Sequence, residues 1–301
     1  MNPLRLLGLS TPAIALCMAA AACGNNARAA EDSSSSPSNP TTAMSTDTIP
    51  TDTASATIKV ETTEGAFTVL LYGDTPRHRD NFLKLAREGY YDSTLFHRVI
   101  RDFMVQAGDP DSRTAAPGQR LGAGGPGYTI EAEIMYPRHF HKRYTLAAAR
   151  QGDQVNPEKR SSGSQFYITT GRRMLPAQLD AMASQMRGRK LQETFNGLVR
   201  SRMAEIQQLQ AKGDTAALNA LQQQLIAQTE AAVPADAGAM PAEVKEAYSA
   251  VGGAPHLDGA YTVFGEVIAG QDVIDRIEQA ATDGSDRPTA DVRIIKMQVV
   301  E

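Results

Sequence analysis

The chain has 301 residues and a net charge of −4, so it is long enough for one or two folded domains and lacks the basic excess of an obligate nucleic-acid-binding protein. Its two cysteines, Cys17 and Cys23, both lie near the N-terminus, so the rest of the chain can form neither a disulfide nor a thiolate metal site. Among the five histidines, His139 and His141 are close together, but no further residue completes a metal site around them.

The first segment of the chain predicts export. Met1–Ala22 has one positive charge, Arg5, followed by an apolar, Ala-rich run that is short for a membrane span. We interpret it as a secretory signal peptide. The stretch Ala20–Gly24 resembles the site at which bacterial lipoproteins are cut and lipidated, which makes Cys23 the candidate lipidation site. A competing small-x-small site at residues 27–29 would instead release a soluble secreted protein.

A low-complexity stretch follows, and residues 23–56 are predicted to form a lipidated, disordered tether. Its Ser, Thr, Pro and Ala residues cannot bury enough apolar surface to offset the entropy lost on ordering. Such a spacer lets a lipid-anchored domain stand away from a membrane. We therefore expect the protein in the bacterial cell envelope or periplasm, although the sequence does not define which membrane holds it.

The folded part begins with a predicted hairpin and a helix. Thr57–Thr62 and Ala66–Leu71 both alternate apolar and polar residues and are joined by a short turn. Thr75 and Pro76 then form a typical helix start, a capping residue followed by proline in the first turn. Gly89 is expected to end this helix.

A second hairpin carries most of the candidate chemistry. Leu95–Ile100 and Phe103–Ala107 are predicted as short strands joined by a turn at Arg101–Asp102. Because alternate side chains of a strand share a face, this hairpin can hold an arginine beside an aromatic ring, a thioether and an amide. Composition alone would make it an ordinary half-buried hairpin with a solvated arginine.

The remaining local patterns predict connections and closing elements. Gly122–Gly127 lacks the Lys-Ser/Thr ending of a phosphate-binding P-loop and opens no periodic helix, so we expect a flexible connection. Tyr128–Ile134 is a predicted strand. The chain closes with a helix near Asp272–Gln279 and a last strand at Val292–Val300.

Four segments together resemble the cyclophilins, a family of peptidyl-prolyl isomerases. FHRVIRDFMVQAGD at residues 96–109 is similar to the family signature FHRVIxxFMxQxGD. YTLAAAR at 144–150 and GSQFYI at 163–168 resemble the segments that line the family's substrate groove. HLDGAYTVFG at 256–265 resembles the family's LDGxxxVFG. The length and mixed chemistry of these strings make a chance match improbable.

The resemblance covers Thr57–Gly171 and His256–Glu301, which is enough for one domain. It implies a mainly β fold, a closed eight-stranded antiparallel barrel capped by two helices, and the many short alternating strands agree with it. Between these parts, residues 172–255 show apolar residues at helical spacing. They predict two helices separated by a turn at Gly213–Asp214, and a third from Pro241 to Val251. This inserted segment either packs on itself and the barrel or acts as a docking arm.

The resemblance also implies an activity: faster cis/trans rotation of X-Pro bonds in proline-containing polypeptides, which needs no metal or cofactor. Its catalytic residues would be Arg98, Phe103 and Gln106, with Arg98 donating toward the proline nitrogen of the twisted amide. The substrate-binding positions that it implies are Met104, Ala149, Arg150, Gln165, Tyr167, His256, Leu257 and Tyr261.

Four of these positions depart from the better-known eukaryotic pattern of the family. His256 stands in place of Trp, Tyr261 in place of His, Tyr167 in place of Phe and Arg150 in place of Asn. Loss of the Trp predicts weak binding of cyclosporin-type inhibitors. The arginine predicts a changed preference for the residues that precede proline, while Tyr261 keeps an aromatic wall with a polar tip.

Two functions from different classes remain open at this point. The first is an active isomerase acting on exported proteins, and the joint presence of Arg98, Phe103 and Gln106 favours it. The second is a non-catalytic proline-binding or chaperone module in which the helical segment does the work. A hydrolase is not expected, because no Ser, His and Asp group shows the spacing of a nucleophile site. Client proteins and oligomeric state are not defined by the sequence.

Overall fold

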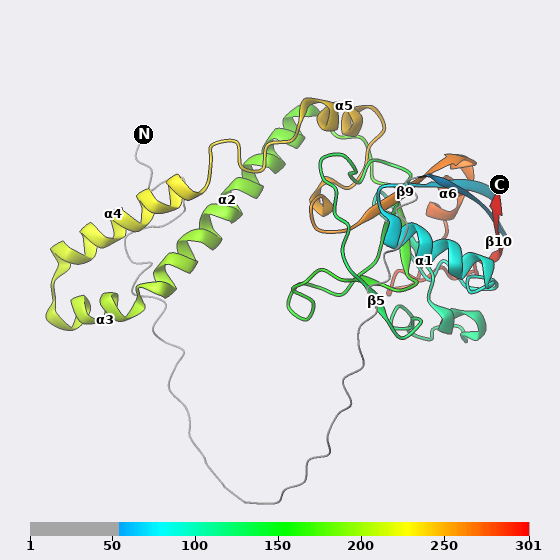
Figure 1. Ribbon diagram of the computed structural model, residues 1–301, viewed down its shortest axis with the longest axis horizontal. Helices are drawn as coiled ribbons and strands as arrows, with labels where there is room; N and C mark the ends of the chain where they lie inside the picture. Colours follow the sequence, from blue (N-terminus) through cyan, green and yellow to red (C-terminus); the bar gives the residue numbers. More distant parts are fainter. Residues whose placement is uncertain (1–53, 301) are drawn as a thin grey trace, which may run out of the picture. The chain divides into compact units, whose positions relative to one another are not determined.

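The computed structural model describes residues 54–300, so the predicted signal peptide, Cys23 and nearly all of the tether lie outside the described residues. The described chain divides into two compact units (Figure 1). One consists of residues 54–184 and 238–300, and the other of residues 185–237. The first contains the sheet and the second is helical. Each unit is described by itself below.

One antiparallel sheet of eight strands forms the first unit, in the spatial order β10-β1-β2-β9-β6-β8-β4-β3. The prediction of a mainly β, eight-stranded fold is thus confirmed. The strands are β1 (Ala56–Thr62), β2 (Gly65–Leu71), β3 (Arg98–Ile100), β4 (Met104–Ala107), β6 (Thr145–Ala148), β8 (Phe166–Thr169), β9 (Val263–Ala269) and β10 (Ile294–Val300).

The sheet is less closed than the sequence predicts. Its edge strands β10 and β3 do not pair along their lengths. Instead, segments next to them are joined by backbone bonds, from Phe96 N–H to Val292 O at 2.9 Å and from Ile294 N–H to Thr94 O at 2.8 Å. The prediction of a fully closed barrel is therefore too strong. The reason is that β3 has three residues and offers little backbone for pairing.

Two helices cover the main core of the sheet. Helix α1 (Pro76–Arg87) begins at the predicted proline and buries Phe82 and Leu85, and Gly89 follows it with φ +66°. Helix α6 (Gln271–Glu278) buries Ile274 and Ile277 against β2 and β4. In Figure 1, α1 is cyan and α6 orange. The two predicted capping helices are thus confirmed, and their apolar faces complete one continuous core with the inner side of the sheet.

Some predicted strands are shorter in the structure. The strand expected at Tyr128–Ile134 is reduced to β5 (Thr129–Ile130), which pairs with β7 (Ser161–Ser162) in a separate small sheet. Close contact with Gly163 explains where this pairing stops. A Cβ atom at Gly163 would lie 2.7 Å from the carbonyl oxygen of Tyr128, so the two chains approach tightly where β7 ends.

The segment between β8 and β9 is helical, as predicted, with one helix more than expected. Its helices are α2 (Pro176–Ser201), α3 (Met203–Lys212), α4 (Thr215–Ala232) and α5 (Ala242–Ala250). The extra helix arises because the first predicted helix is interrupted at Arg202. The turn at Gly213–Asp214 is confirmed, with Gly213 at φ +67° and Asp214 capping α4 through Ala217 N–H.

The helices of this segment contribute to two separate apolar clusters. In the helical unit, Phe195, Ile206 and Leu225 belong to a core of α2, α3 and α4. In the unit with the sheet, α5 and the start of α2 bury Leu179 and Tyr248 together. Among the helices of residues 54–300, none has the length and apolar character needed to cross a membrane.

Candidate active site

A row of side chains crosses the sheet on the face opposite the main core. In the strand register Arg98 pairs with Gln106, Gln106 with Tyr167, and Tyr167 with Ala147. Directly paired residues point to the same side of a sheet, and their chain neighbours point to the other. Val105, beside Gln106, accordingly lies in the main core. The register therefore gathers residues from distant parts of the sequence on one outer face.

A pocket of about 150 Å³ lies on this face. Its floor includes Met104 and Tyr167, which are 2% and 5% exposed. The ring of Tyr261 stands edge-on to that of Tyr167, with centroids 5.9 Å apart. The size of the pocket and its apolar side chains Phe103, Met104 and Leu257 suit a small apolar ring. Its lining consists of Arg98, Phe103, Met104, Gln106, Ala149, Arg150, Tyr167, Leu257 and Tyr261.

Arg98 brings a charged donor to the pocket. Its side chain is 45% exposed, and its Nε lies 3.5 Å from Oδ2 of Asp286, which is equally exposed. An ion pair of this length and exposure contributes little free energy. The guanidinium therefore keeps donors available for a group bound in the pocket.

Gln106 belongs to a short chain of amide groups. Its Nε2 donates to Oε1 of Gln165 at 3.0 Å, and Nε2 of Gln165 donates to the carbonyl oxygen of Gly124 at 2.7 Å. These bonds hold the Gln106 amide in one orientation without using its oxygen. That oxygen and the remaining amide hydrogen can face a peptide group in the groove.

The glycine-rich loop forms a wall of a wider groove of about 790 Å³ beside the pocket. The carboxylate of Asp109 accepts the backbone N–H groups of Gly122 and Gly124. A Cβ atom at Gly124 would lie 2.2 Å from Asp109 Oδ1, so this approach requires glycine. The loop is therefore tied down, and the predicted flexible connection is wrong. Ala149 and Gln165 line the same groove.

The family is decided by a comparison with known sequences. The family model described as "Cyclophilin type peptidyl-prolyl cis-trans isomerase/CLD" matches residues 57–231 and 247–299. The chain belongs to the cyclophilin family. It is accordingly a peptidyl-prolyl cis-trans isomerase by family, and its matched residues include every residue of the row that crosses the sheet.

Known cyclophilin-type proteins resemble it along most of its length. An isomerase of Arabidopsis thaliana is 27% identical over 245 residues, which cover 81% of this chain and 93% of the relative. A putative bifunctional phosphatase/peptidyl-prolyl cis-trans isomerase of Streptococcus pyogenes is 26% identical over 247 residues, but this chain spans 38% of that protein. A Cryptosporidium parvum cyclophilin, crystallised in the presence of the dipeptide Ala-Pro, is 20% identical, with a TM-score of 0.48 and coverage of 81% and 99%.

In this cyclophilin, Arg150 is largely occupied by contacts within the protein. Its side chain is 4% exposed, and Nη1 forms an ion pair with Asp153 at 2.6 Å. Its Nε donates to the carbonyl oxygen of Ala260 at 2.8 Å, and its guanidinium lies over the ring of Tyr261. Arg150 lines the pocket, as predicted, but its charge is paired. Its main contribution is to hold Tyr261 and the neighbouring backbone in place.

His256 is placed next to the pocket without lining it. It lies in a 3-10 helix, η4 (Pro255–Leu257), and its ring centroid is 5.1 Å from that of Phe103. Partial burial and the neighbouring His141 lower the pKa of His256 from its ordinary value, while the carboxylate of Asp258 opposes them. The ring therefore stays neutral near pH 7 and supports Phe103 by packing.

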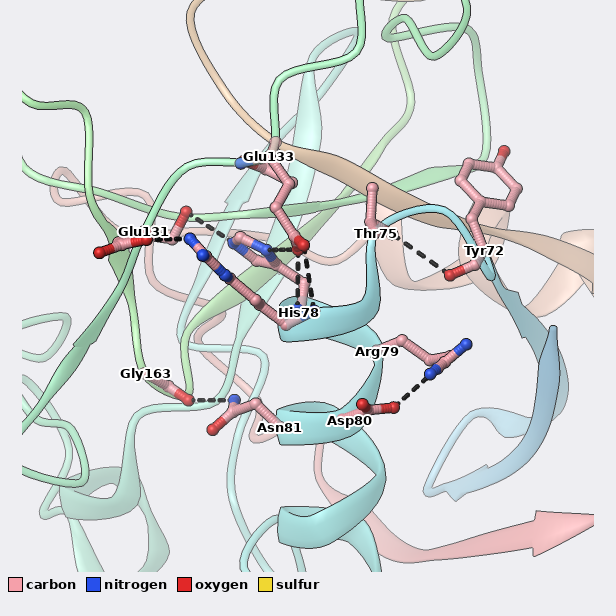
Figure 2. A network of polar contacts seen from close by, with 12 residues as sticks. Tyr72, Thr75, His78, Arg79, Asp80, Asn81, Glu131, Glu133 and Gly163 are labelled. Atoms are coloured by element: carbon pink, nitrogen blue, oxygen red, sulfur yellow. Dashed lines mark hydrogen bonds and ion pairs between the residues drawn. The ribbon is translucent and has the colours of Figure 1, made fainter. Parts of the chain in front are cut away.

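A polar network at the start of α1 was not predicted from the sequence (Figure 2). Glu133 accepts from Nδ1 of His78 at 2.6 Å and from the backbone N–H groups of His78 and Arg77. His78 Nε2 lies 2.9 Å from Oγ of Ser161. Burial raises the pKa of Glu133, but the hydrogen bonds from His78 and Arg77 outweigh it and hold the pKa below its ordinary value.

The order serine, histidine, carboxylate is that of an acyl-transfer triad, but this arrangement is structural. Ser161 is 1% exposed, and the cavity beside His78 has about 10 Å³, which is too small for a substrate. The network instead joins β7, the segment at Glu133 and the first turn of α1. It thereby supports the outer wall of the substrate groove.

The two neighbouring histidines turn to different partners. His139 Nε2 lies 2.8 Å from Asp74, and His141 Nδ1 lies 2.9 Å from Asp258. In the described part of the chain, no group of three or more His, Cys, Asp or Glu residues could hold a metal ion. His141 Nε2 lies 2.9 Å from the hydroxyl of Tyr167. The sequence signal for that contact is a tyrosine where the family pattern has phenylalanine.

Proposed function

We propose that this cyclophilin accelerates the rotation of X-Pro bonds in exported proteins, and that Arg98 supplies the decisive interaction. The observation that carries the proposal is the position of its guanidinium. It lines a pocket together with Phe103, Met104 and Leu257, and its nearest carboxylate is a half-exposed Asp286 at 3.5 Å. The donors of Arg98 are thus held close to a bound proline and are not saturated by a buried partner.

The chemistry needs a preorganised donor and no covalent step. Rotation of a peptide bond has a barrier of about 18–20 kcal/mol, because the nitrogen lone pair is delocalised onto the carbonyl. In the twisted state the lone pair returns to nitrogen and can accept a hydrogen bond. A guanidinium that donates to it binds the twisted amide more strongly than the planar one, and this difference lowers the barrier.

The remaining pocket residues fix the substrate on either side of the rotating bond. Phe103, Met104 and Tyr167 would hold the proline ring, since they form one apolar cluster on this face. The Gln106 amide, oriented by Gln165, would hold the peptide group that precedes the proline. With both sides held, binding energy favours the geometry in which Arg98 meets the nitrogen.

The test is cis/trans exchange of an Ala-Pro peptide measured by NMR, with the parent protein and the variants Arg98→Ala and Arg98→Lys. Loss of one preorganised charged donor is expected to lower the exchange rate about 10²- to 10³-fold in Arg98→Ala. Arg98→Lys keeps the charge but not the planar fork of donors, so its rate should lie between the two.

Arg101→Ala is the matched control, because this arginine is exposed in the adjacent turn and does not line the pocket. It should retain the parent rate. Peptide binding by the parent without acceleration would replace the isomerase by the non-catalytic proline-binding or chaperone module. Full activity in Arg98→Ala would show that the arginine is not the catalytic group.

We further propose that the protein is exported and anchored through Cys23. The support is the sequence before residue 57, with a signal-like segment, a lipoprotein-like cysteine and a low-complexity spacer. Fractionation of a bacterial host should place the parent in the membrane pellet, and Cys23→Ala should move it to the soluble fraction. A parent that is soluble in the periplasm would favour cleavage at residues 27–29 instead.

A further inference from the structure

The floor of the pocket is tied to a buried chain of polar side chains. Tyr167 Oη lies 2.9 Å from Nε2 of His141, and His141 Nδ1 lies 2.9 Å from Oδ1 of Asp258. The hydroxyl of Tyr248 donates to Oδ2 of Asp258 at 2.7 Å. The His141 and Asp258 side chains are 1% and 4% exposed, and Tyr248 is fully buried. Water therefore competes little for these bonds.

The direction of each bond follows from the donors and acceptors available. The Asp258 carboxylate accepts only, and its Oδ1 faces both the backbone N–H and the ring Nδ1 of His141. The Nδ1 atom therefore carries a ring proton, and in the neutral ring Nε2 accepts from the hydroxyl of Tyr167. Burial raises the pKa of Tyr167 and of Tyr248 above the ordinary value, so both hydroxyls keep their protons.

This chain contacts two walls of the pocket. Tyr167 lies in β8, whereas Asp258 directly follows Leu257, which lines the pocket from the segment before β9. The ring of Tyr261 stands edge-on to Tyr167 and also to His141, at centroid distances of 5.9 and 6.3 Å. A displacement of Asp258 would therefore move Leu257 and Tyr261 relative to the floor.

We propose that Tyr248, Asp258 and His141 are positioning residues that set the shape of the proline pocket through the hydroxyl of Tyr167. The proposal rests on the isomerase function proposed above. A phenylalanine at position 167 would fill the same space without needing His141, so the hydroxyl serves as the link. Tyr248 lies in α5 and is held there by Val244 and the start of α2. Helix α5 thereby acts on a pocket that it does not line.

The test is a double-mutant cycle with Tyr248→Phe, Tyr167→Phe and the double variant, each of which removes hydroxyl groups and keeps the rings. NMR exchange of an Ala-Pro peptide gives kcat and KM, and titration with the same peptide gives its Kd. Tyr248→Phe is expected to raise KM and Kd about three- to tenfold, the effect of one buried hydrogen bond, with kcat within about twofold. The double variant should bind the peptide no less tightly than the single variant that binds it less tightly.

Tyr91→Phe is the matched control, since Tyr91 is a buried tyrosine of the main core whose hydroxyl has no hydrogen-bond partner in the described part of the chain. Its KM and Kd should equal those of the parent. In the unmodified protein, peptide binding should also shift the ring ¹⁵N resonances of His141, a readout that needs no variant to fold.

The proposal would be overturned if kcat, KM and Kd of Tyr248→Phe all equal those of the parent. It would also be overturned if the effects of the two substitutions on KM and Kd add in the double variant. If the proposed function fails instead, the parent binds the peptide without accelerating its cis/trans exchange. The Kd values of the parent and the variants then still test whether Tyr248 positions the pocket. A parent that does not bind the peptide at all would overturn both.

Discussion

The guanidinium of Arg150 lies over the ring of Tyr261, with the central carbon 4.5 Å from the ring centroid. The same group donates to the carbonyl oxygen of Ala260 and pairs with Asp153. One side chain thus joins the end of β6 to the segment that closes the pocket. Because the Arg150 side chain is almost fully buried, its contacts with Tyr261 and Ala260 are worth more than their counterparts on the surface, whereas Asp153 is 66% exposed.

The first prediction is that Arg150→Lys destabilises the protein and weakens substrate binding. An ammonium group cannot stack on Tyr261 and bond Ala260 and Asp153 at the same time. We expect the free energy of unfolding in urea to fall by about 1–2 kcal/mol and KM to rise, because Tyr261 is released. Denaturation followed by circular dichroism, together with NMR exchange, measures both effects.

Arg138→Lys is the control for this change, since the Arg138 side chain is 68% exposed and pairs with Asp74 at the surface. Its unfolding free energy should stay within about 0.5 kcal/mol of the parent. If the two lysine variants behave alike, Arg150 is not the clamp described above.

The second prediction concerns Asp286, the carboxylate beside Arg98. Asp286→Asn removes the charge that attracts Arg98, so the guanidinium is freer to meet the substrate. The backbone of Asp286 has φ +63°, a conformation that asparagine tolerates well. We expect kcat/KM to rise about two- to fivefold at low ionic strength, the range of an exposed ion pair, and to approach the parent value in high salt.

The matched control is Asp272→Asn, which removes the same charge from an exposed carboxylate that pairs with Arg276 instead. It should leave kcat/KM unchanged at every salt concentration. An equal gain in both variants would assign the effect to net charge and not to the pair with Arg98.

The sequence predicts which face of the sheet carries the site, because the alternation of side chains along a strand depends only on neighbouring residues. Once Arg98 and Gln106 are placed on paired strands, the period of two sends them to one side and Val105 to the other. The signature string therefore places Arg98 and Gln106 on the face that carries the pocket. The prediction of a fully closed barrel was too strong because closure depends on how far β3 and β10 pair, and this is not a local property.

Contacts between distant residues account for what the sequence could not show. His78 meets Glu133 and Ser161, which are 55 and 83 positions away. Arg150 donates to the carbonyl oxygen of Ala260, 110 positions along the chain. Every residue has a backbone carbonyl, so the residue type at position 260 does not indicate this contact. These partners are fixed by the folding of the whole sheet, so residue types and spacing give no signal for them.

The third prediction tests the anchored glycine loop. Gly124→Ala places a Cβ atom 2.2 Å from Asp109 and 2.8 Å from Asp111, so the loop must move and its bond from Gln165 weakens. Gln106 then loses its fixed orientation. We expect KM to rise about tenfold and the free energy of unfolding to fall by about 1–3 kcal/mol.

Gly125→Ala, one residue along, is the control, because a Cβ atom there meets nothing within 4 Å. Its KM and stability should match those of the parent. A tolerated Gly124→Ala would mean that the loop is flexible after all and that its bonds to Asp109 do not shape the groove.

The fourth prediction is a loss of stability in mild acid that depends on His97. This residue precedes Arg98 and is 4% exposed. Burial lowers its pKa to about 4, and the nearby carboxylate of Asp109 opposes the shift only in part. In the unfolded chain the pKa is near 6.5, so between pH 6.5 and 4 the unfolded state binds more protons than the folded one. Stability is therefore full above pH 6.5 and is lost as the pH decreases from 6.5 through 4.

Urea unfolding of the parent and of His97→Gln at pH 7 and pH 5 measures this contribution. Because glutamine does not titrate, the parent should lose about 2 kcal/mol more than the variant between the two pH values. Glu133 does not interfere, since its lowered pKa moves its own loss of stability to more acid pH. The other histidines are present in both proteins, so their contributions to the pH-dependent unfolding free energy cancel in the comparison. Parallel losses in both proteins would show that His97 is not the buried neutral group responsible for the loss of stability.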